Sequence, residues 1–495
     1  MRKRTTITCI MTYLKTNELR FRNELSDEIR LFINEVKIPL TEEIADSGFT
    51  VCHYFYAENG TWYNSCELYE DGEIVSEHTE ECGAVAEENV LENKKIRVRY
   101  AKLSVFGCLS AYFGIDKKWG ALTGIRPTKL YRQTSNRSGE KAAERLFIND
   151  FFVSKEKFSL VRSICETQAQ YISGIDLKKD IDIYIGIPFC VTRCSYCSFS
   201  SGLTTKDGLA EERYVTALLR EIELTRDMIF GRNVRCVYIG GGTPTSLCEE
   251  LLEKVVNSAA GFNAREFTVE AGRPDTITEN KLKILRASGV SRISINAQTT
   301  SDATLERIGR AHTASEFFAA FEMARRAGFD DINTDLIIGL PGEGKGEFMR
   351  SLKDVASLLP ENLTIHTLAI KRASKFGMEN EKGFMSGDDA EAAIESSREL
   401  TSIAGYRPYY MYRQKYMTGN LENTGFSLPG RECVYNIDIM EETVPIVAYG
   451  AGAISKNVKA EPYRIERSPN VKNIEQYTER VDQMAERKTA LFTAD

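Results

Sequence analysis

The stretch Tyr184-Ile-Gly-Ile-Pro-Phe-Cys190-Val-Thr-Arg-Cys194-Ser-Tyr-Cys197-Ser-Phe199 holds three cysteines at the spacing C-x3-C-x2-C. Upstream of them, isoleucine recurs at every second position from Ile181 to Ile187, which predicts a β-strand. Pro188 lacks a backbone N–H, so it ends the strand and leaves the cysteines on a loop. Three thiolates on one short loop can bind three irons of a 4Fe–4S cluster.

The cysteine loop has two other interpretations, a zinc site and buried structural cysteines. Zinc in a structural site takes four ligands, and the histidines nearest in sequence, His78 and His312, lie more than a hundred residues away. The iron–sulfur interpretation is therefore favoured. Because no fourth cysteine follows closely, one iron of the cluster would stay open to a ligand from outside the protein.

Length and composition narrow the class of protein. A chain of 495 residues predicts two or three domains, and 42% hydrophobic with 27% charged residues is typical of a soluble globular protein. The net charge is −7 and no basic block stands out, so nucleic acid is not an expected partner. No apolar run is long enough to span a membrane, and the polar start of the chain does not resemble a secretion signal. We therefore expect a cytoplasmic protein without a membrane partner.

The front of the chain predicts strands joined by hairpins, followed by helices. Val51–Tyr56 alternates apolar and polar residues, and Asn59-Gly60 and Asp71-Gly72 are tight-turn signals. Only glycine, asparagine and aspartate adopt positive φ at low cost, which supports both turns. From residue 102 to about residue 173 the pattern becomes helical. Residues 1–175 are thus predicted to form an α+β domain, whose role the sequence does not indicate.

From about residue 178 to residue 405, six strand-like runs alternate with helical ones. The predicted strands are Ile181–Ile187, Arg235–Ile239, Glu266–Glu270, Arg292–Asn296, Asp331–Ile337 and Leu363–Ala369. The predicted helices are Leu209–Ile229, Leu247–Ala260, Glu279–Ala287, Ser315–Arg326 and Glu347–Leu359. Strict alternation implies the α/β class, with a parallel sheet and right-handed crossovers. Six units are fewer than the eight of a closed barrel, so residues 176–405 predict a partial (β/α)6 barrel with its site at the carboxyl ends of the strands.

The last ninety residues contain aromatic and glycine-rich runs. Tyr406–Arg413 is rich in tyrosine, and the glycines of Gly450-Ala-Gly-Ala453 predict a turn. We expect residues 406–495 to form a cap over the mouth of the barrel. The final twenty-five residues are highly charged and predict an exposed helix.

Residues suited to ligand binding follow several of the predicted strands. Three glycines in Gly240-Gly-Gly-Thr-Pro-Thr245 would let a ligand approach the backbone, whose N–H groups can hydrogen-bond a carboxylate. Polar side chains occur on or after the later strands. Glu270 ends the third strand, Gln298 follows the fourth, Arg310 lies in Arg307–His312, and Asp335 lies within the fifth. Carboxylates can bind ribose hydroxyls or an ammonium group, and arginine can bind a carboxylate. Taken singly, each of these residues would serve equally well in a salt bridge or a helix cap.

The segment Tyr184–Phe199 resembles the radical S-adenosylmethionine (SAM) enzymes, and within them the oxygen-independent coproporphyrinogen III oxidase group. The segments Gly120–Leu130, Tyr412–Gly425 and Gly430–Asn436 are most similar to the HemZ branch of that group. The resemblance implies the radical SAM type of partial barrel, with SAM bound to the open iron through its amino and carboxylate groups. It also implies that an electron from the reduced cluster splits SAM and leaves a 5′-deoxyadenosyl radical.

The resemblance also assigns binding residues by position. The cluster ligands are Cys190, Cys194 and Cys197, and the residues that match SAM contacts are Tyr184, Gly241, Gly242, Thr243, Glu270, Gln298, Arg310, Asp335 and Ala369. In the family these residues contact the SAM on the iron or a second SAM beside it. We therefore expect two SAM molecules. His312 and His366 are interpreted as structural, because the radical is made by the cofactor.

The activity implied by the resemblance is oxidative decarboxylation in anaerobic haem biosynthesis. Two propionates of coproporphyrinogen III would become vinyl groups, giving protoporphyrinogen IX, with a reducing donor such as flavodoxin or ferredoxin supplying electrons. The alternatives are a haem chaperone with the same barrel and a radical SAM enzyme that acts on another tetrapyrrole.

Two departures from the family pattern bear on these alternatives. Characterised oxidases of the group carry a further cysteine two residues after the triple, where this chain has Phe199. The haem chaperones share that phenylalanine, but they carry a His-Asn-x-x-Tyr-Trp motif. The equivalent stretch here is Tyr435-Asn-Ile-Asp-Ile-Met440, without the histidine or the tryptophan. The sequence therefore favours the enzyme.

Overall fold

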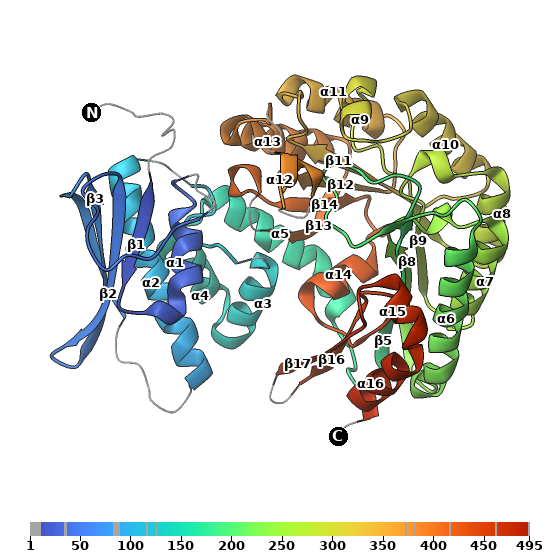
Figure 1. Ribbon diagram of the computed structural model, residues 1–495, viewed down its shortest axis with the longest axis horizontal. Coiled ribbons are helices and arrows are strands. Elements are labelled where there is room, and N and C mark those ends of the chain that lie inside the picture. The colour runs from blue at the N-terminus through green and yellow to red at the C-terminus, as the bar shows by residue number, and fades with distance from the viewer. Residues whose placement is uncertain are drawn as a thin grey trace. The chain divides into compact units, whose positions relative to one another are not determined.

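The computed structural model describes residues 11–33, 37–82, 90–114, 117–124, 126–371, 374–379, 383–414, 417–460 and 463–493. The chain divides into two compact units, Met1–Arg162 and Ser163–Asp495. Figure 1 draws the first unit in blue to cyan and the second from teal to red. The three-part division at residues 175 and 405 stays a prediction.

The first unit contains a four-stranded sheet. Its order is β1-β2-β3-β4, with β1 parallel to β2 and the other pairs antiparallel. The predicted hairpin turns are confirmed, since Asn59-Gly60 and Asp71-Gly72 have φ values of 50°, 81°, 51° and 84°. The strands are β1 (Thr12–Thr16), β2 (Phe49–Glu58), β3 (Thr61–Glu70) and β4 (Glu73–Glu81). The helices are α1 (Arg22–Ile29), α2 (Val90–Phe113), α3 (Pro127–Ser138), α4 (Glu140–Arg145) and α5 (Lys155–Ile172), the last of which continues into the second unit.

The second unit is built on an eleven-stranded sheet with the order β13-β14-β12-β11-β10-β9-β8-β5-β15-β16-β17. Six consecutive neighbours, from β12 to β5, run parallel. They are β5 (Asp180–Ile187), β8 (Asn233–Gly241), β9 (Glu266–Glu270), β10 (Arg292–Ser294), β11 (Ile332–Ile338) and β12 (Asn362–Thr367). All six predicted strands and the partial (β/α)6 barrel are therefore confirmed.

The helices between these strands lie along the outer side of the barrel, as Figure 1 shows. Those predicted from the sequence are α6 (Leu209–Thr225), α7 (Glu249–Ala260), α8 (Glu279–Ala287), α10 (Ala314–Arg326) and α11 (Lys345–Ala356). Three further helices were not predicted, namely α9 (Asp302–Arg307), α12 (Lys375–Glu379) and α13 (Gly387–Ile403).

Alternate residues of the barrel strands face the helices and the interior. Ile183 of β5 is fully buried in the same core cluster as Leu218 of α6 and Val255 of α7. Tyr184, the next residue of β5, belongs instead to an interior cluster that includes Tyr238 of β8. Because the strands are parallel, their carboxyl ends lie at one common edge of the sheet, where the last inward side chains come together.

The segment expected to form a cap extends the sheet at both ends. On one side β14 pairs antiparallel with β12, and on the other β15 pairs parallel with β5. An open barrel leaves unpaired N–H and C=O groups on its two edge strands, and the added strands satisfy them. The added elements are β13 (Arg407–Tyr412), β14 (Asn423–Ser427), α14 (Val434–Glu441), β15 (Ile446–Tyr449), β16 (Ile454–Lys459) and β17 (Arg464–Pro469).

The chain ends in two helices, α15 (Ile474–Glu479) and α16 (Val481–Thr493). The expectation of an exposed terminal helix is wrong for one face of α16. Met484 and Lys488 are buried on that face, and the Lys488 side chain is 0% exposed. The charge of Lys488 is balanced by Glu221 of α6 at 2.6 Å, a contact that periodicity alone does not reveal.

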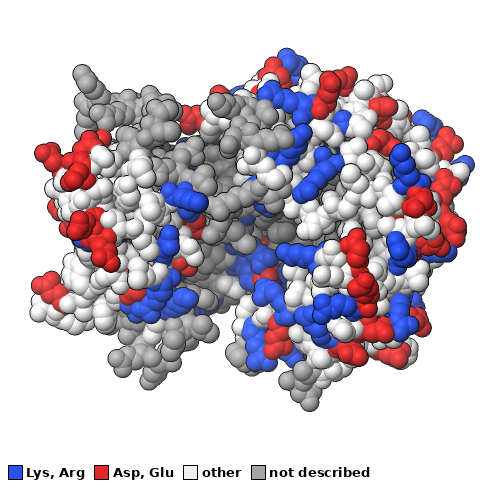
Figure 2. Space-filling model, in the orientation of Figure 1, with Lys and Arg blue, Asp and Glu red and all other residues white. Residues whose placement is uncertain are grey.

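The surface of the second unit is mixed in charge. On the face that Figure 2 shows, Lys and Arg side chains alternate with Asp and Glu over the outer helices. Within the described parts of the chain, no helix is both long enough and apolar enough to cross a bilayer.

Candidate functional site

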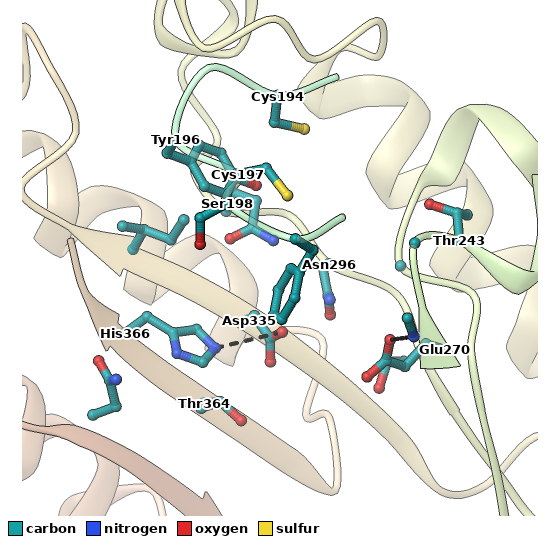
Figure 3. A pocket seen from close by; sticks show the side chains of 18 of the residues that line it. Cys194, Tyr196, Cys197, Ser198, Thr243, Glu270, Asn296, Asp335, Thr364 and His366 are labelled. Atoms are coloured by element: carbon teal, nitrogen blue, oxygen red, sulfur yellow. Dashed lines mark hydrogen bonds and ion pairs between the residues drawn. The ribbon is translucent and has the colours of Figure 1, made fainter. Parts of the chain in front are cut away.

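A cavity of about 410 Å³ opens at the carboxyl ends of the barrel strands. Eleven of the twelve predicted site residues line it, namely Cys190, Cys194, Cys197, Gly241, Gly242, Thr243, Glu270, Gln298, Arg310, Asp335 and Ala369. Figure 3 shows the cysteine loop on one side of this cavity and Asp335, Thr364 and His366 on strands across from it. The barrel thus brings together residues that lie up to 179 positions apart in the sequence.

Short-range contacts fix the cysteine loop. Two short strands, β6 (Phe189–Cys190) and β7 (Gly202–Leu203), pair with each other and close the loop at its base. The hydroxyl of Thr192 donates to the carbonyl of Gly309, and the N–H of Ser195 donates to the carbonyl of Ile308. These bonds hold the loop against the segment that follows α9.

The glycine run corrects one expectation. The N–H of Gly241 donates to Glu270, the N–H of Gly242 to the carbonyl of Ile187, and the N–H of Thr243 to the carbonyl of Phe189. These groups therefore already have partners within the chain and are not free for a carboxylate. At Gly242 the missing side chain instead lets the backbone pack closely against the cysteine loop. A Cβ there would lie 2.5 Å from the Phe189 carbonyl oxygen and 3.0 Å from Cys190 Sγ.

Glu270, at the end of β9, is held by two donors. The hydroxyl of Tyr238 donates to Oε1 at 2.6 Å, and the N–H of Gly241 donates to Oε2 at 3.3 Å. Burial raises the pKa of Glu270 to about 7, and the nearby charge of Asp335 acts in the same direction. This carboxyl group therefore changes charge near neutral pH.

Asp335 of β11 faces His366 of β12 across the cavity wall. Nε2 of His366 lies 3.6 Å from Oδ2 of Asp335, and Nδ1 of His366 lies 3.3 Å from the hydroxyl of Tyr412. Burial acts to raise the pKa of Asp335, but bonds from His366 and Asn333 outweigh it, so that the pKa is lowered. His366 lines the cavity, although a structural role was predicted for it. Alternating polar residues at Asn362, Thr364 and His366 are a signal that could have identified it.

Several buried polar atoms at the cavity have no partner among the described residues. They include Oε1 of Gln298, Oδ1 of Asn296 and Nε of Arg310. Gln298 also has a positive φ of 64°, a conformation that costs energy for any residue other than glycine. Gln298 lines the cavity, and a strained backbone together with an unpaired buried amide oxygen is typical of a ligand site.

Tyr184 is the one predicted site residue that does not line the cavity. Its ring centroid lies 6.4 Å from that of Tyr238 and 6.3 Å from that of Tyr435, and the three rings are stacked. Tyr435, at the position where the haem chaperones carry their histidine, is only 7% exposed. This stack fills the barrel interior beside the cavity. Phe199, in contrast, lines the cavity and is 68% exposed.

Comparisons with known proteins agree with this geometry. The family model of the radical SAM superfamily matches residues 184–355. The chain is 39% identical to the oxygen-independent coproporphyrinogen-III oxidase-like protein HemZ of Bacillus subtilis, over 82% of each chain. It is 32% identical to the heme chaperone HemW of the same organism, over 54% of this chain and 69% of HemW.

A solved structure shares the fold. The coproporphyrinogen III oxidase HemN of Escherichia coli matches with a TM-score of 0.51 and 23% identity, over 65% of this chain and 73% of HemN. A radical SAM domain implies a 4Fe–4S cluster and SAM, and the three loop cysteines beside incompletely bonded polar groups fit that pair of cofactors. The chain therefore belongs to the radical SAM superfamily, in the oxygen-independent coproporphyrinogen III oxidase-like group that contains HemZ.

Proposed function

We propose that this protein decarboxylates two propionate side chains of coproporphyrinogen III to vinyl groups, using SAM, and so forms protoporphyrinogen IX in anaerobic haem biosynthesis. Each propionate would lose a β-hydrogen atom, one carbon dioxide and one electron. The observation that carries the proposal is that the three cysteines and the polar residues of the barrel strands line the same cavity. The relationship to HemZ supplies the tetrapyrrole substrate class.

Cys190, Cys194 and Cys197 would hold the cluster, because they share one loop and all three line the cavity. When bound, the cluster and SAM supply one-electron cleavage of SAM and hence a radical that can take hydrogen from carbon. The close approach at Gly242 leaves room beside Cys190, and the hydroxyl of Thr243 lies 3.5 Å from Cys190 Sγ. A reducing donor such as flavodoxin or ferredoxin would provide the electron.

The other cavity residues would bind and orient SAM. The carboxylates of Glu270 and Asp335 can accept hydrogen bonds from ribose hydroxyls or an ammonium group, and Arg310 can donate to a carboxylate. Gln298 lines the cavity, and its buried amide oxygen has no partner in the described chain. As the family resemblance implies, two SAM molecules would bind here, and residues of β9 and β11 would contact them. Tyr184 would act through Tyr238, which bonds Glu270.

Basic side chains at the cavity suit the propionates of the substrate. Lys371 lines the cavity and is exposed, so it can meet a carboxylate at the mouth. His366, on β12, also lines the cavity and is partly buried. Phe199 offers an exposed aromatic ring at the same mouth, where the planar substrate would enter.

The second candidate is a haem chaperone, and the relationship to HemW supports it. A haem carrier needs an axial ligand, for which histidine is the usual residue. His366 in the cavity is a candidate, but Asp335 and Tyr412 already contact both of its ring nitrogens. The position of the chaperone histidine is occupied by Tyr435, which is stacked inside the barrel. The enzyme is therefore favoured, and a radical SAM enzyme acting on another tetrapyrrole is the third candidate.

Anaerobic turnover tests the proposal. Reduced, cluster-loaded protein is incubated with SAM and coproporphyrinogen III, and products are read by mass spectrometry. We expect loss of two carbon dioxide molecules per substrate, matched by 5′-deoxyadenosine. Tight stoichiometric haem binding, with SAM cleaved but coproporphyrinogen untouched, would reject the enzyme and favour the chaperone.

A further inference from the structure

A buried arginine lies next to the cysteine loop, outside the set of expected SAM contacts. Arg273 follows β9, directly before the short helical turn Pro274–Thr276, and is 3% exposed. Its Nε and Nη2 donate to the two carboxylate oxygens of Asp275, at 3.1 and 2.9 Å. This bidentate pair fixes the plane of the guanidinium group and leaves Nη1 for other partners.

Nη1 of Arg273 contacts the loop that carries the cysteines. It donates to the carbonyl oxygen of Thr192 at 3.3 Å and lies 3.7 Å from Sγ of Cys194. Sulfur is a larger acceptor than oxygen, so the second contact is also a hydrogen bond. Figure 3 shows Cys194 on this loop at the edge of the cavity. One nitrogen thus contacts both the backbone of the loop and a cysteine sulfur.

We propose that Arg273 is a positioning residue that raises the reduction potential of the cluster by donating a hydrogen bond to Cys194. The proposal rests on the proposed function, because it requires a cluster on the three cysteines. Reduction adds negative charge to the cluster and its thiolate ligands, so a donor to one of the sulfurs stabilises the reduced form more than the oxidised form. Asp275 balances the charge of Arg273, and the directional bond therefore carries the effect.

The test is a redox titration of the full chain, loaded with iron and sulfide under anaerobic conditions and without SAM, followed by EPR. Arg273→Met keeps the length of the side chain and removes its donors. We expect unchanged iron content and an equilibrium constant for one-electron reduction about tenfold lower, which corresponds to a midpoint potential about 59 mV more negative. Arg273→Lys, which keeps the charge without the planar fork, should give a smaller shift in the same direction.

A matched control is Arg235→Lys. Arg235 lies near the start of β8, far along the strand from Gly241, and pairs with the buried Asp438 at 3.0 Å. This variant should keep the potential of the natural protein. It separates a general effect of losing an arginine ion pair inside the second unit from a local effect at Cys194.

A natural potential in Arg273→Met with full iron content would overturn the inference. If Arg273→Met does not bind iron, the midpoint potential of Arg273→Lys tests the inference instead. A potential equal to that of the natural protein overturns the inference, and a more negative potential supports it. If the natural protein binds no cluster at all, the proposed function fails and the inference fails with it. Iron content distinguishes this last result from an unchanged potential.

Discussion

The second unit has buried polar groups in two regions, around Glu221 of α6 and at the cavity. Around Glu221 the hydrogen bonds are completed within the chain, whereas at the cavity some of them are not. Glu221 accepts from the N–H of Gly450 at 3.0 Å and from the side chains of Asn470, Tyr477 and Lys488 at 2.8, 2.6 and 2.6 Å. At the cavity, Oε1 of Gln298 and Nε of Arg310 find no partner among the described residues.

The difference separates two uses of buried polarity. A carboxylate with four donors is satisfied by the fold itself, so its role is to hold α16 and the loop after β15 against α6. Unpaired groups in the cavity would cost free energy unless a ligand completes them. Changes around Glu221 should therefore reduce stability, whereas changes in the cavity should reduce cofactor binding.

The largest effect is expected at the cysteines. Replacing Cys190, Cys194 or Cys197 by Ala removes a thiolate that no nearby residue replaces, so iron content and the brown absorbance should fall in each variant. Cys236→Ala and Cys248→Ala are controls, since neither residue lies on the loop, and both should keep their iron. A variant lacking all three loop cysteines that still bound about four irons per chain would refute the assignment.

The next effect concerns stability. Lys488→Met should lower the free energy of unfolding of the full chain by about 3–5 kcal/mol, because it leaves the buried Glu221 carboxylate without its cation. Lys254→Met is the control, since Lys254 pairs with Glu250 at 2.7 Å on the surface, where an ion pair contributes little to stability. Urea unfolding measures both, and equal stabilities for the two variants would contradict the role of Glu221.

Asp335→Ala should act on SAM without removing the cluster. A hydrogen bond to a ligand contributes about 1–3 kcal/mol, so formation of 5′-deoxyadenosine should fall about tenfold or more while iron content stays unchanged. Asp354→Ala is a control, because Asp354 bonds Thr300 on the exposed side of the barrel. A natural rate of SAM cleavage in Asp335→Ala would remove this residue from the site.

The smallest effect is a pH dependence at Glu270. The pKa of Glu270 is raised to about 7, so the folded chain binds this proton more tightly than the unfolded chain does. The stability that this proton contributes is therefore present below about pH 4.5 and is lost as pH rises through 7. The ionised form is the better acceptor for SAM. The affinity for SAM should therefore rise between pH 6 and pH 8, by at most about tenfold for one proton, and Glu270→Gln should flatten the profile. An equally steep profile in Glu270→Gln would assign the titration to another group.

Much of the barrel could be predicted from the sequence, because its strands and helices each carry their own periodicity. Glu279–Ala287 was predicted with the same bounds that α8 has in the structure. The cysteine triple and the polar residues after the strands also depend on local spacing. Parallel topology then implies that they share one edge of the sheet.

The remaining features depend on contacts between distant segments. The burial of Lys488 needs Glu221, which lies 267 positions earlier in the chain. The contact of Arg273 with Cys194 joins the segment after β9 to a loop 79 positions away. The N–H group of Gly242 was expected to be free because its partner, the carbonyl of Ile187, lies on a different strand. Local patterns carry no information about such pairs.

EPR spectra of the reduced, cluster-loaded chain with and without SAM would test most directly whether the cavity holds both cofactors. SAM bound at the open iron should change the cluster signal in the natural protein, and Asp335→Ala should need a higher SAM concentration for the same change. A signal that stays unchanged at saturating SAM, in protein that carries its full complement of iron, would contradict a shared site for cluster and SAM.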